Sequence, residues 1–117
     1  LNISGGEISG NRVNSTNDDL GFDGGGGVYV DLYATLDLSG TARISGNYAC
    51  AVDYKESATF GGGFGGGVYV GPQATATLSG LAEVRGNTAK RTGGGLFVDA
   101  AARLTVSGTS IPRATSA

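Results

Sequence analysis

Acidic side chains are the main candidates for chemistry, because the sequence has no histidine and a single cysteine, Cys50. Asp31 and Asp99 follow equivalent copies of a repeated phrase, and Gly71 takes the corresponding place in the copy between them. If the copies lie on neighbouring strands about 4.8 Å apart, the two carboxylates are about 10 Å apart. This distance is at or beyond the upper limit for the paired acids of an inverting glycosidase. We therefore expect a protein that is not an enzyme.

A second group of carboxylates consists of Asp18, Asp19 and Asp23, which lie close together in the chain. Calcium takes about 6–8 oxygen ligands, so this stretch could supply part of a calcium site. A solvated acidic loop is the interpretation we favour, with calcium as the open alternative. The sequence predicts no other cofactor.

The charge balance argues against two classes of partner. The chain has 8 basic and 10 acidic residues, which are spread along it and give a formal net charge of −2. This is not the basic footprint that a nucleic-acid-binding domain carries. No apolar run approaches the roughly 18 residues of a membrane-spanning helix. We therefore predict no nucleic-acid partner and no membrane span.

The elements that position these side chains come from three sequence phrases, each of which occurs three times. The first phrase is a glycine triplet followed by apolar, aromatic and valine residues, at 25–30, 65–70 and 93–98. The others are Leu/Val-Ser-Gly at 38–40, 78–80 and 106–108, and Ile/Val-x-Gly-Asn at 8–11, 44–47 and 84–87. Repeats of about 20–50 residues are typical of solenoids, propellers and other arrays.

Loop insertions explain why the repeats are unequally spaced. The second and third glycine triplets are 28 residues apart, whereas successive asparagine phrases are 36 and 40 residues apart. All the extra residues fall between an asparagine phrase and the next glycine triplet, within 14–24 and 50–64. We therefore predict one domain over residues 1–117, with 28-residue coils at about 8–43, 44–83 and 84–111 and two loop insertions.

Each coil contains three short apolar segments, represented by 28–30, 35–38 and the region of Ile44. Alternating β-branched residues bounded by glycine indicate strands, and no segment has the apolar stripe of a helix. Three strands per coil, stacked in parallel, give an all-β fold, a three-sided β-solenoid. We predict a right-handed parallel β-helix, because parallel crossover connections are right-handed in nearly all proteins.

Alignment of the coils groups equivalent side chains into columns. Apolar columns such as Val28, Val68 and Leu96 should face the core. An amide ladder is predicted at one corner, where asparagine also tolerates a left-handed backbone. A charged column alternates acid, base and acid, so each charge should meet its opposite on the next strand. The ladder residues are Asn11, Asn47 and Asn87, and the charged residues are Glu7, Arg43 and Glu83.

An aromatic column is the last predicted feature of the stack. Tyr29, Tyr69 and Phe97 occupy equivalent positions and should point outward. Such a column could bind sugars by ring stacking or dock a partner. We favour the interpretation that the rings stabilise the sheet by stacking on one another.

The asparagine and glycine phrases resemble the paired FxxN and GGAI repeats of polymorphic outer-membrane proteins, which are autotransporter-type passengers. The matching segments are 8–11 with 26–29, 44–47 with 66–69, and 84–87 with 94–97. This chain has Ile or Val where that family has Phe, so the resemblance extends to architecture rather than membership. It implies a right-handed β-helix on a bacterial surface, used in adhesion or as a stalk. The wider pectin-lyase-like class also includes polysaccharide lyases and hydrolases, so the fold alone does not choose a function.

The predicted ends of the solenoid bear strand edges without a cap, and residues 1–5 align with 36–40 as part of a further coil. Unpaired edges invite pairing with another strand. We therefore expect a non-enzymatic structural module of an extracellular or bacterial cell-surface assembly. It would be a filament subunit that stacks head to tail, or an adhesin or stalk segment. The alternative is a carbohydrate-binding or polysaccharide-degrading β-helix that uses the face of the insertion loops, and glycosylation at Asn2 or Asn14 stays open.

Overall fold

The computed structural model describes residues 1–15, 25–51, 64–89, 93–108 and 111–116, and these residues form strands and no helix. The strands are β1 (Asn2–Ile3), β2 (Glu7–Ser9), β3 (Arg12–Ser15), β4 (Val28–Val30), β5 (Thr35–Leu38), β6 (Arg43–Ser45), β7 (Tyr48–Ala51), β8 (Val68–Val70), β9 (Thr75–Leu78), β10 (Glu83–Ala89), β11 (Leu96–Val98), β12 (Arg103–Val106) and β13 (Ile111–Ser116). The prediction of an all-β protein is confirmed.

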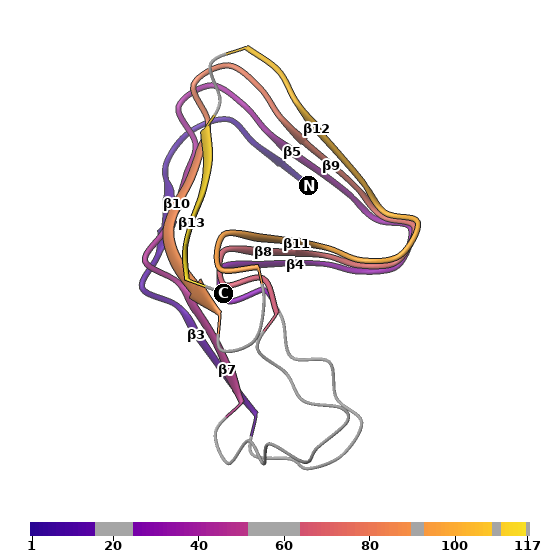
Figure 1. The fold of residues 1–117 in the computed structure, drawn as a ribbon. Helices are drawn as coiled ribbons and strands as arrows, with labels where there is room; N and C mark the ends of the chain where they lie inside the picture. The colour runs from indigo at the N-terminus through magenta and orange to yellow at the C-terminus, as the bar shows by residue number, and fades with distance from the viewer. Residues whose placement is uncertain (16–24, 52–63, 90–92, 109–110, 117) are drawn as a thin grey trace.

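The described strands form three parallel sheets. One sheet has the order β1-β5-β9-β12 and another has the order β4-β8-β11. In the third sheet β2 and β3 pair with β6 and β7, both of which pair with the longer β10, and β13 also pairs with β10. Figure 1 shows the three sheets on three sides of a common centre, with equivalent strands of successive repeats side by side.

Strand pairing joins residues that the sequence alignment treats as equivalent. Val28 pairs with Val68, which pairs with Leu96. The outward residues that come next, Tyr29, Tyr69 and Phe97, pair in the same register. The sheet that contains β5, β9 and β12 is aligned in the same way, from Thr35 through Thr75 to Arg103. The predicted register is confirmed in these two sheets and between β2, β6 and β10 of the third. It differs at β13, where Pro112 rather than Ile111 pairs with Val84 and the pairing has register shifts.

The hydrophobic core lies between the sheets and consists of the inward columns. Side chains from all three sheets are fully or almost fully buried in the middle of the stack, among them Leu36, Ile44, Val70 and Leu78. Inward residues of the middle repeats pair with apolar residues on both sides, as Ile44 does with Ile8 and Val84, which removes both faces of the side chain from water. Burial of this kind contributes about 25 cal/mol per Å² of apolar surface.

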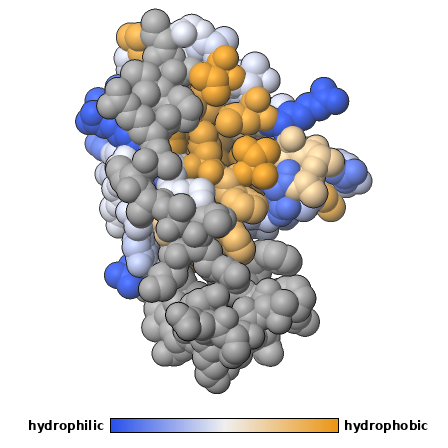
Figure 2. Space-filling view, in the orientation of Figure 1, coloured by the Kyte–Doolittle hydropathy of each residue, from blue (hydrophilic) through white to orange (hydrophobic). Residues whose placement is uncertain are grey.

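The same columns become exposed at the two ends of the stack. Leu1 is 70% exposed at one end, whereas Val98 and Val106 are 39% and 44% exposed at the other. Figure 2 shows hydrophobic side chains gathered over the centre of the molecule, where Figure 1 shows the space between the three sheets. Among the described residues, the apolar side chains of these columns are thus buried in the middle and exposed at the two ends.

The bend at the asparagine phrase differs from the sequence prediction in one respect. The residue with a left-handed backbone is the glycine before each asparagine, with φ of 67° at Gly10 and 64° at Gly46 and Gly86. Glycine adopts this conformation without the steric penalty of a side chain. The asparagines have no positive φ, and the side chains of Asn47 and Asn87 are buried, whereas Asn11 is exposed.

Another bend, at residues 31–34 and its copies, has a left-handed backbone at a residue other than glycine. Tyr33, Gln73 and Ala101 are equivalent residues with φ of 61°, 60° and 59°. Each is the third residue of a four-residue turn. A backbone hydrogen bond closes the turn, such as the one from the Ala34 N–H to the Asp31 carbonyl oxygen at 3.0 Å. A left-handed backbone at the third position is the geometry of a type II turn. The sequence did not predict the left-handed backbone at this position, because Tyr, Gln and Ala rarely adopt it.

Candidate functional site

The buried amide ladder is the most regular polar feature of the molecule. Oδ1 of Asn47 accepts hydrogen bonds from the backbone and side-chain N–H groups of Asn11, at 3.0 and 3.1 Å. Oδ1 of Asn87 accepts the same two bonds from Asn47, at 2.9 and 3.0 Å. Nδ2 of Asn47 also donates to the Ile8 carbonyl, as Nδ2 of Asn87 does to Ile44. The structure thus brings all three predicted ladder residues together and ties each repeat to the next.

The glycine triplets leave the space that the ladder occupies. A Cβ on Gly27 would lie 2.8 Å from Nδ2 of Asn47, and one on Gly67 would lie 2.6 Å from Nδ2 of Asn87. The preceding glycine is close to backbone instead, since a Cβ on Gly66 would lie 2.2 Å from the Thr88 carbonyl oxygen. The two phrases recur together because the triplet of one sheet packs directly on the asparagine corner of another.

The aromatic column is also formed by the predicted residues. The rings of Tyr29 and Tyr69 stack with centroids 4.9 Å apart and an interplanar angle of 13°. Tyr69 and Phe97 stack with centroids 5.5 Å apart at 7°. Phe64, which the sequence analysis did not include, packs on Phe97 at 4.9 Å with a tilt of 47°. The signal for Phe64 would have been its place directly before the second glycine triplet.

The column is less accessible than the sequence predicted. Tyr69 is only 2% exposed, because both faces of its ring are covered by neighbouring rings, whereas Tyr29 is 47% exposed at the end of the stack. A sugar that stacks on an aromatic residue needs a free ring face, and Tyr69 has none. Although Tyr69 has an outward position in its strand, the aromatic column is therefore not a continuous surface on which sugars could stack.

The tyrosine hydroxyls lie close to acidic residues. The Tyr69 hydroxyl donates a short hydrogen bond to Oδ2 of Asp99. Burial, followed by this hydrogen bond and the negative charge of Asp99, raises the pKa of Tyr69 well above its ordinary value. Burial and the charges of Asp31 and Asp99 also raise the pKa of Tyr29. Both hydroxyls therefore stay protonated at neutral pH and can act as hydrogen-bond donors.

The two acids occupy equivalent turns, as the sequence predicted. Oδ1 of Asp31 accepts from the Leu32 N–H at 2.7 Å, and Oδ1 of Asp99 accepts from the Ala100 N–H at the same distance. Gly71 fills this place in the repeat between them, and a Cβ there would lie 2.6 Å from the Val30 carbonyl oxygen. The carboxylates are thus held by their own turns and separated by a residue with no side chain, which does not resemble a catalytic pair.

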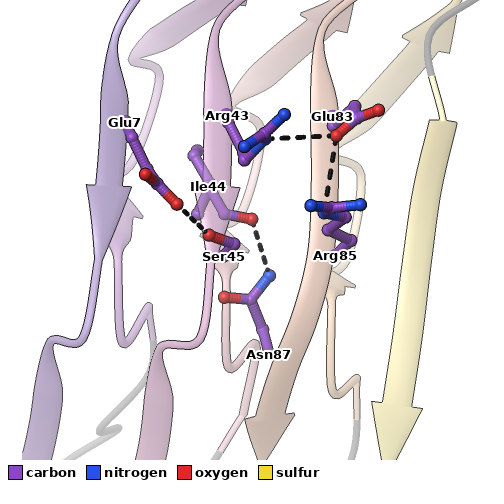
Figure 3. Close-up of polar contacts among 7 residues, drawn as sticks. All are labelled: Glu7, Arg43, Ile44, Ser45, Glu83, Arg85 and Asn87. Atoms are coloured by element: carbon purple, nitrogen blue, oxygen red, sulfur yellow. Dashed lines mark hydrogen bonds and ion pairs between the residues drawn. The ribbon is translucent and has the colours of Figure 1, made fainter.

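The charged column forms only part of the predicted alternation. Arg43 pairs with Glu83 at 3.2 Å, and Arg85 also approaches Glu83, at 3.5 Å. Glu7 does not complete the ladder but accepts a hydrogen bond from the Ser45 hydroxyl at 2.5 Å (Figure 3). The expectation that Glu7 pairs with Arg43 is therefore wrong, because Glu7 instead bonds to Ser45, which lies on the same strand as Arg43. Partly exposed pairs of this kind contribute about 0–1 kcal/mol each.

The candidate calcium ligands Asp18, Asp19 and Asp23 lie outside the described residues. Within the described ranges, no group of three or more His, Cys, Asp or Glu side chains could hold a metal ion. The part of the chain that the structure describes also contains no helix of the length and apolar character needed to cross a membrane.

The open ends are the remaining candidate for function. We define the N-terminal end by the edge strands β1, β2, β3 and β4, and the C-terminal end by β11, β12 and β13. Among the described residues, each of these strands pairs with another strand on one side only. Leu1 and Tyr29 are exposed at the first end, and Val98 and Val106 at the second. Both ends thus combine edge strands of the described sheets with exposed apolar side chains.

Comparison with protein-family models, with curated proteins and with solved structures found no match for this chain. The likeness to polymorphic outer-membrane proteins consequently stays a prediction from the two sequence phrases.

Proposed function

We propose that the three parallel sheets are the faces of a right-handed parallel β-helix, in which each repeat is one coil. The in-register pairing of every phrase with its next copy supports this architecture. So does the position of the core, to which all three sheets contribute. The hand of the helix follows from the strong preference of parallel crossovers for the right-handed connection.

The protein is a non-enzymatic structural module of an extracellular or bacterial cell-surface assembly. The observation that carries this proposal is the pair of open ends, where core columns that are sealed in the middle reach solvent. Each described sheet ends in an edge strand at both ends, so a second copy placed end to end with its β1 on β12 and its β2 on β13 would extend two of the three sheets. An end-to-end contact that does not close on itself produces a filament. The same surfaces would serve a stalk or adhesin segment.

The register inside the chain supports head-to-tail stacking rather than stacking of like ends. Strands β4, β1 and β2 of an incoming copy belong to the same sheets as β11, β12 and β13 of the copy below. The apolar pairs would continue across the junction, with Ile3 of the incoming copy above Val106. The sheet of β4, β8 and β11 has one strand fewer, so Tyr29 of the incoming copy would lie two strand spacings from Phe97.

Sedimentation over a range of protein concentration and pH tests the proposal. We expect species larger than the monomer, and we expect Val106→Lys to abolish them by placing a charge in the open core column. Thr105→Lys is the matched control, because Thr105 is on the same edge strand but at an exposed outward position. Circular dichroism establishes that both variants fold. A wild-type chain that stays monomeric under all conditions contradicts the proposal.

Carbohydrate binding is a second candidate, favoured by the exposed Tyr33 beside the carboxylate turn of Asp31. A glycan array and a calcium titration test it. The candidate is rejected if neither gives a response, or if Tyr33→Ala binds as the wild type does.

A further inference from the structure

We propose that the N-terminal end of the molecule binds an extended polypeptide segment, which adds a strand to the open edge of β4. The segment has a glycine triplet followed by apolar, aromatic and apolar residues, the pattern that the chain itself uses in this sheet. Addition of a peptide strand to an open sheet edge is a recurring mode of peptide recognition. The site lies within a single chain, so the proposal does not depend on stacking of copies.

The site is a step in the N-terminal end. Strand β1 pairs with β5 and β2 pairs with β6, whereas β4, which belongs to the same repeat as β5 and β6, is the first described strand of its sheet. Among the described residues, two sheets thus extend one strand further than the third. At the opposite end the three sheets finish together, because β11, β12 and β13 pair with β8, β9 and β10 of one repeat. The position beside β4 is therefore bordered by two other sheets, and the edge of β11 is not.

The apolar side chains that border this step are less buried than their partners inside the stack. Ile3 and Ile8 are partly buried, whereas Leu38 and Ile44, with which they pair, are 1% and 0% exposed. The inward valines of β4 belong to the same core cluster as Leu38 and Ile44. An added strand would give Ile3 and Ile8 the same kind of neighbour, which explains why the segment needs apolar residues at its inward positions.

The asparagine ladder explains why the segment must begin with glycine. Asn47 and Asn87 are buried, and each lies against the last glycine of a triplet, Gly27 or Gly67. Asn11 is exposed, and among the described residues no glycine triplet lies against it. A Cβ on Gly27 would lie 2.8 Å from Nδ2 of Asn47, so a side chain at the equivalent position of the added strand would meet Asn11.

The chain beside this step also offers backbone acceptors and an aromatic ring. Within the molecule, the N–H of Gly27 donates to the Gly67 carbonyl at 3.1 Å, and the N–H of Gly67 donates to the Gly95 carbonyl at 3.0 Å. Among the described residues, no backbone N–H donates to the carbonyls of Gly25 and Gly27. Tyr29 is 47% exposed at the same edge. The triplet of the segment would donate to these carbonyls, and its aromatic ring would extend the column from Tyr29.

Fluorescence anisotropy of a labelled peptide with the full chain tests the proposal. The peptide has the sequence of residues 65–71, Gly-Gly-Gly-Val-Tyr-Val-Gly, which contains no charged side chain. The matched control peptide has alanine in place of the third glycine. In the protein, Tyr29→Ala removes the ring on which the peptide would stack. Tyr33→Ala is its control, because Tyr33 is 71% exposed in the same repeat but lies in the bend after the strand. Circular dichroism establishes that both variants fold.

We expect saturable binding of the glycine peptide to the wild type, and binding of the alanine peptide that is at least about tenfold weaker, because its methyl group meets Asn11. Tyr29→Ala should weaken binding of the glycine peptide about tenfold through loss of contact area and ring stacking, while Tyr33→Ala binds as the wild type does. The proposal is wrong if the glycine peptide does not bind, if the two peptides bind equally, or if Tyr29→Ala leaves binding unchanged.

Discussion

At the scale of single residues, Asn47 shows how a polar side chain can hold a core together. Its side chain is buried, receives two hydrogen bonds from Asn11 and donates to both Ile8 and Asn87. Buried polar groups are costly without partners, so the ladder is stable only because each amide satisfies the next one. The glycine triplets are required for the same reason, since no other residue leaves room for the amides.

Asn47→Ala should lower the free energy of unfolding by about 3 kcal/mol, because it removes the four hydrogen bonds that the buried amide makes to Asn11, Ile8 and Asn87. Asn11→Ala should cost less than about 1 kcal/mol, since Asn11 is exposed at the N-terminal end and water can replace its bonds. Denaturant unfolding of the two variants measures the difference. Equal losses would show that the buried amide contributes no more than the exposed one.

Several residue-level details could not be predicted from the sequence. The columns of Asn47 and Tyr69 followed from alignment of the repeats, because equivalent residues on parallel strands must lie side by side. The burial of Tyr69 did not, since it depends on rings that cover both of its faces. The choice of Ser45 over Arg43 as the partner of Glu7 depends on side-chain conformations, which the repeat pattern does not determine.

At the scale of strands and bends, the repeat period determines the register and local chemistry determines the bends. The strand pairs could be predicted because one alignment accounts for all three sheets. The bend at Tyr33, Gln73 and Ala101 could not, because these side chains do not favour a left-handed backbone. The backbone hydrogen bond across the turn and the strands on either side impose that conformation.

Two glycines should respond to alanine for different physical reasons. Gly66 does not have a left-handed backbone, but a Cβ there would lie 2.2 Å from the Thr88 carbonyl oxygen and 2.4 Å from that of Gly94. Gly66→Ala must therefore separate two sheets, and we expect a loss of about 3 kcal/mol or more, or failure to fold. Gly86→Ala meets nothing closer than 3.8 Å and should cost only about 1 kcal/mol of backbone strain at φ 64°. Thermal unfolding compares the two, and a larger loss for Gly86→Ala would contradict this packing.

At the scale of the whole molecule, we expect stability to be unevenly distributed among the repeats. In repeat proteins each unit contacts only its neighbours, so a terminal unit has one interface where an interior unit has two. Val98 and Val106 are exposed in the last repeat, whereas the equivalent Val70 and Leu78 of the preceding repeat are buried. A second copy seated on this end would give the last repeat its missing interface.

Leu36 and Leu104 provide a matched test of this gradient, because they belong to one column on either side of Ala76. Leu36 is fully buried, so Leu36→Ala should cost about 3 kcal/mol through lost burial and a cavity. Leu104 is only partly buried, and Leu104→Ala should cost about 1 kcal/mol in dilute solution. If copies stack end to end, the second value rises with protein concentration while the first does not, because association covers Leu104 but leaves Leu36 as it was. Chemical unfolding at two well-separated concentrations measures both effects, and equal costs for the two substitutions in dilute solution would show that the last repeat is already sealed.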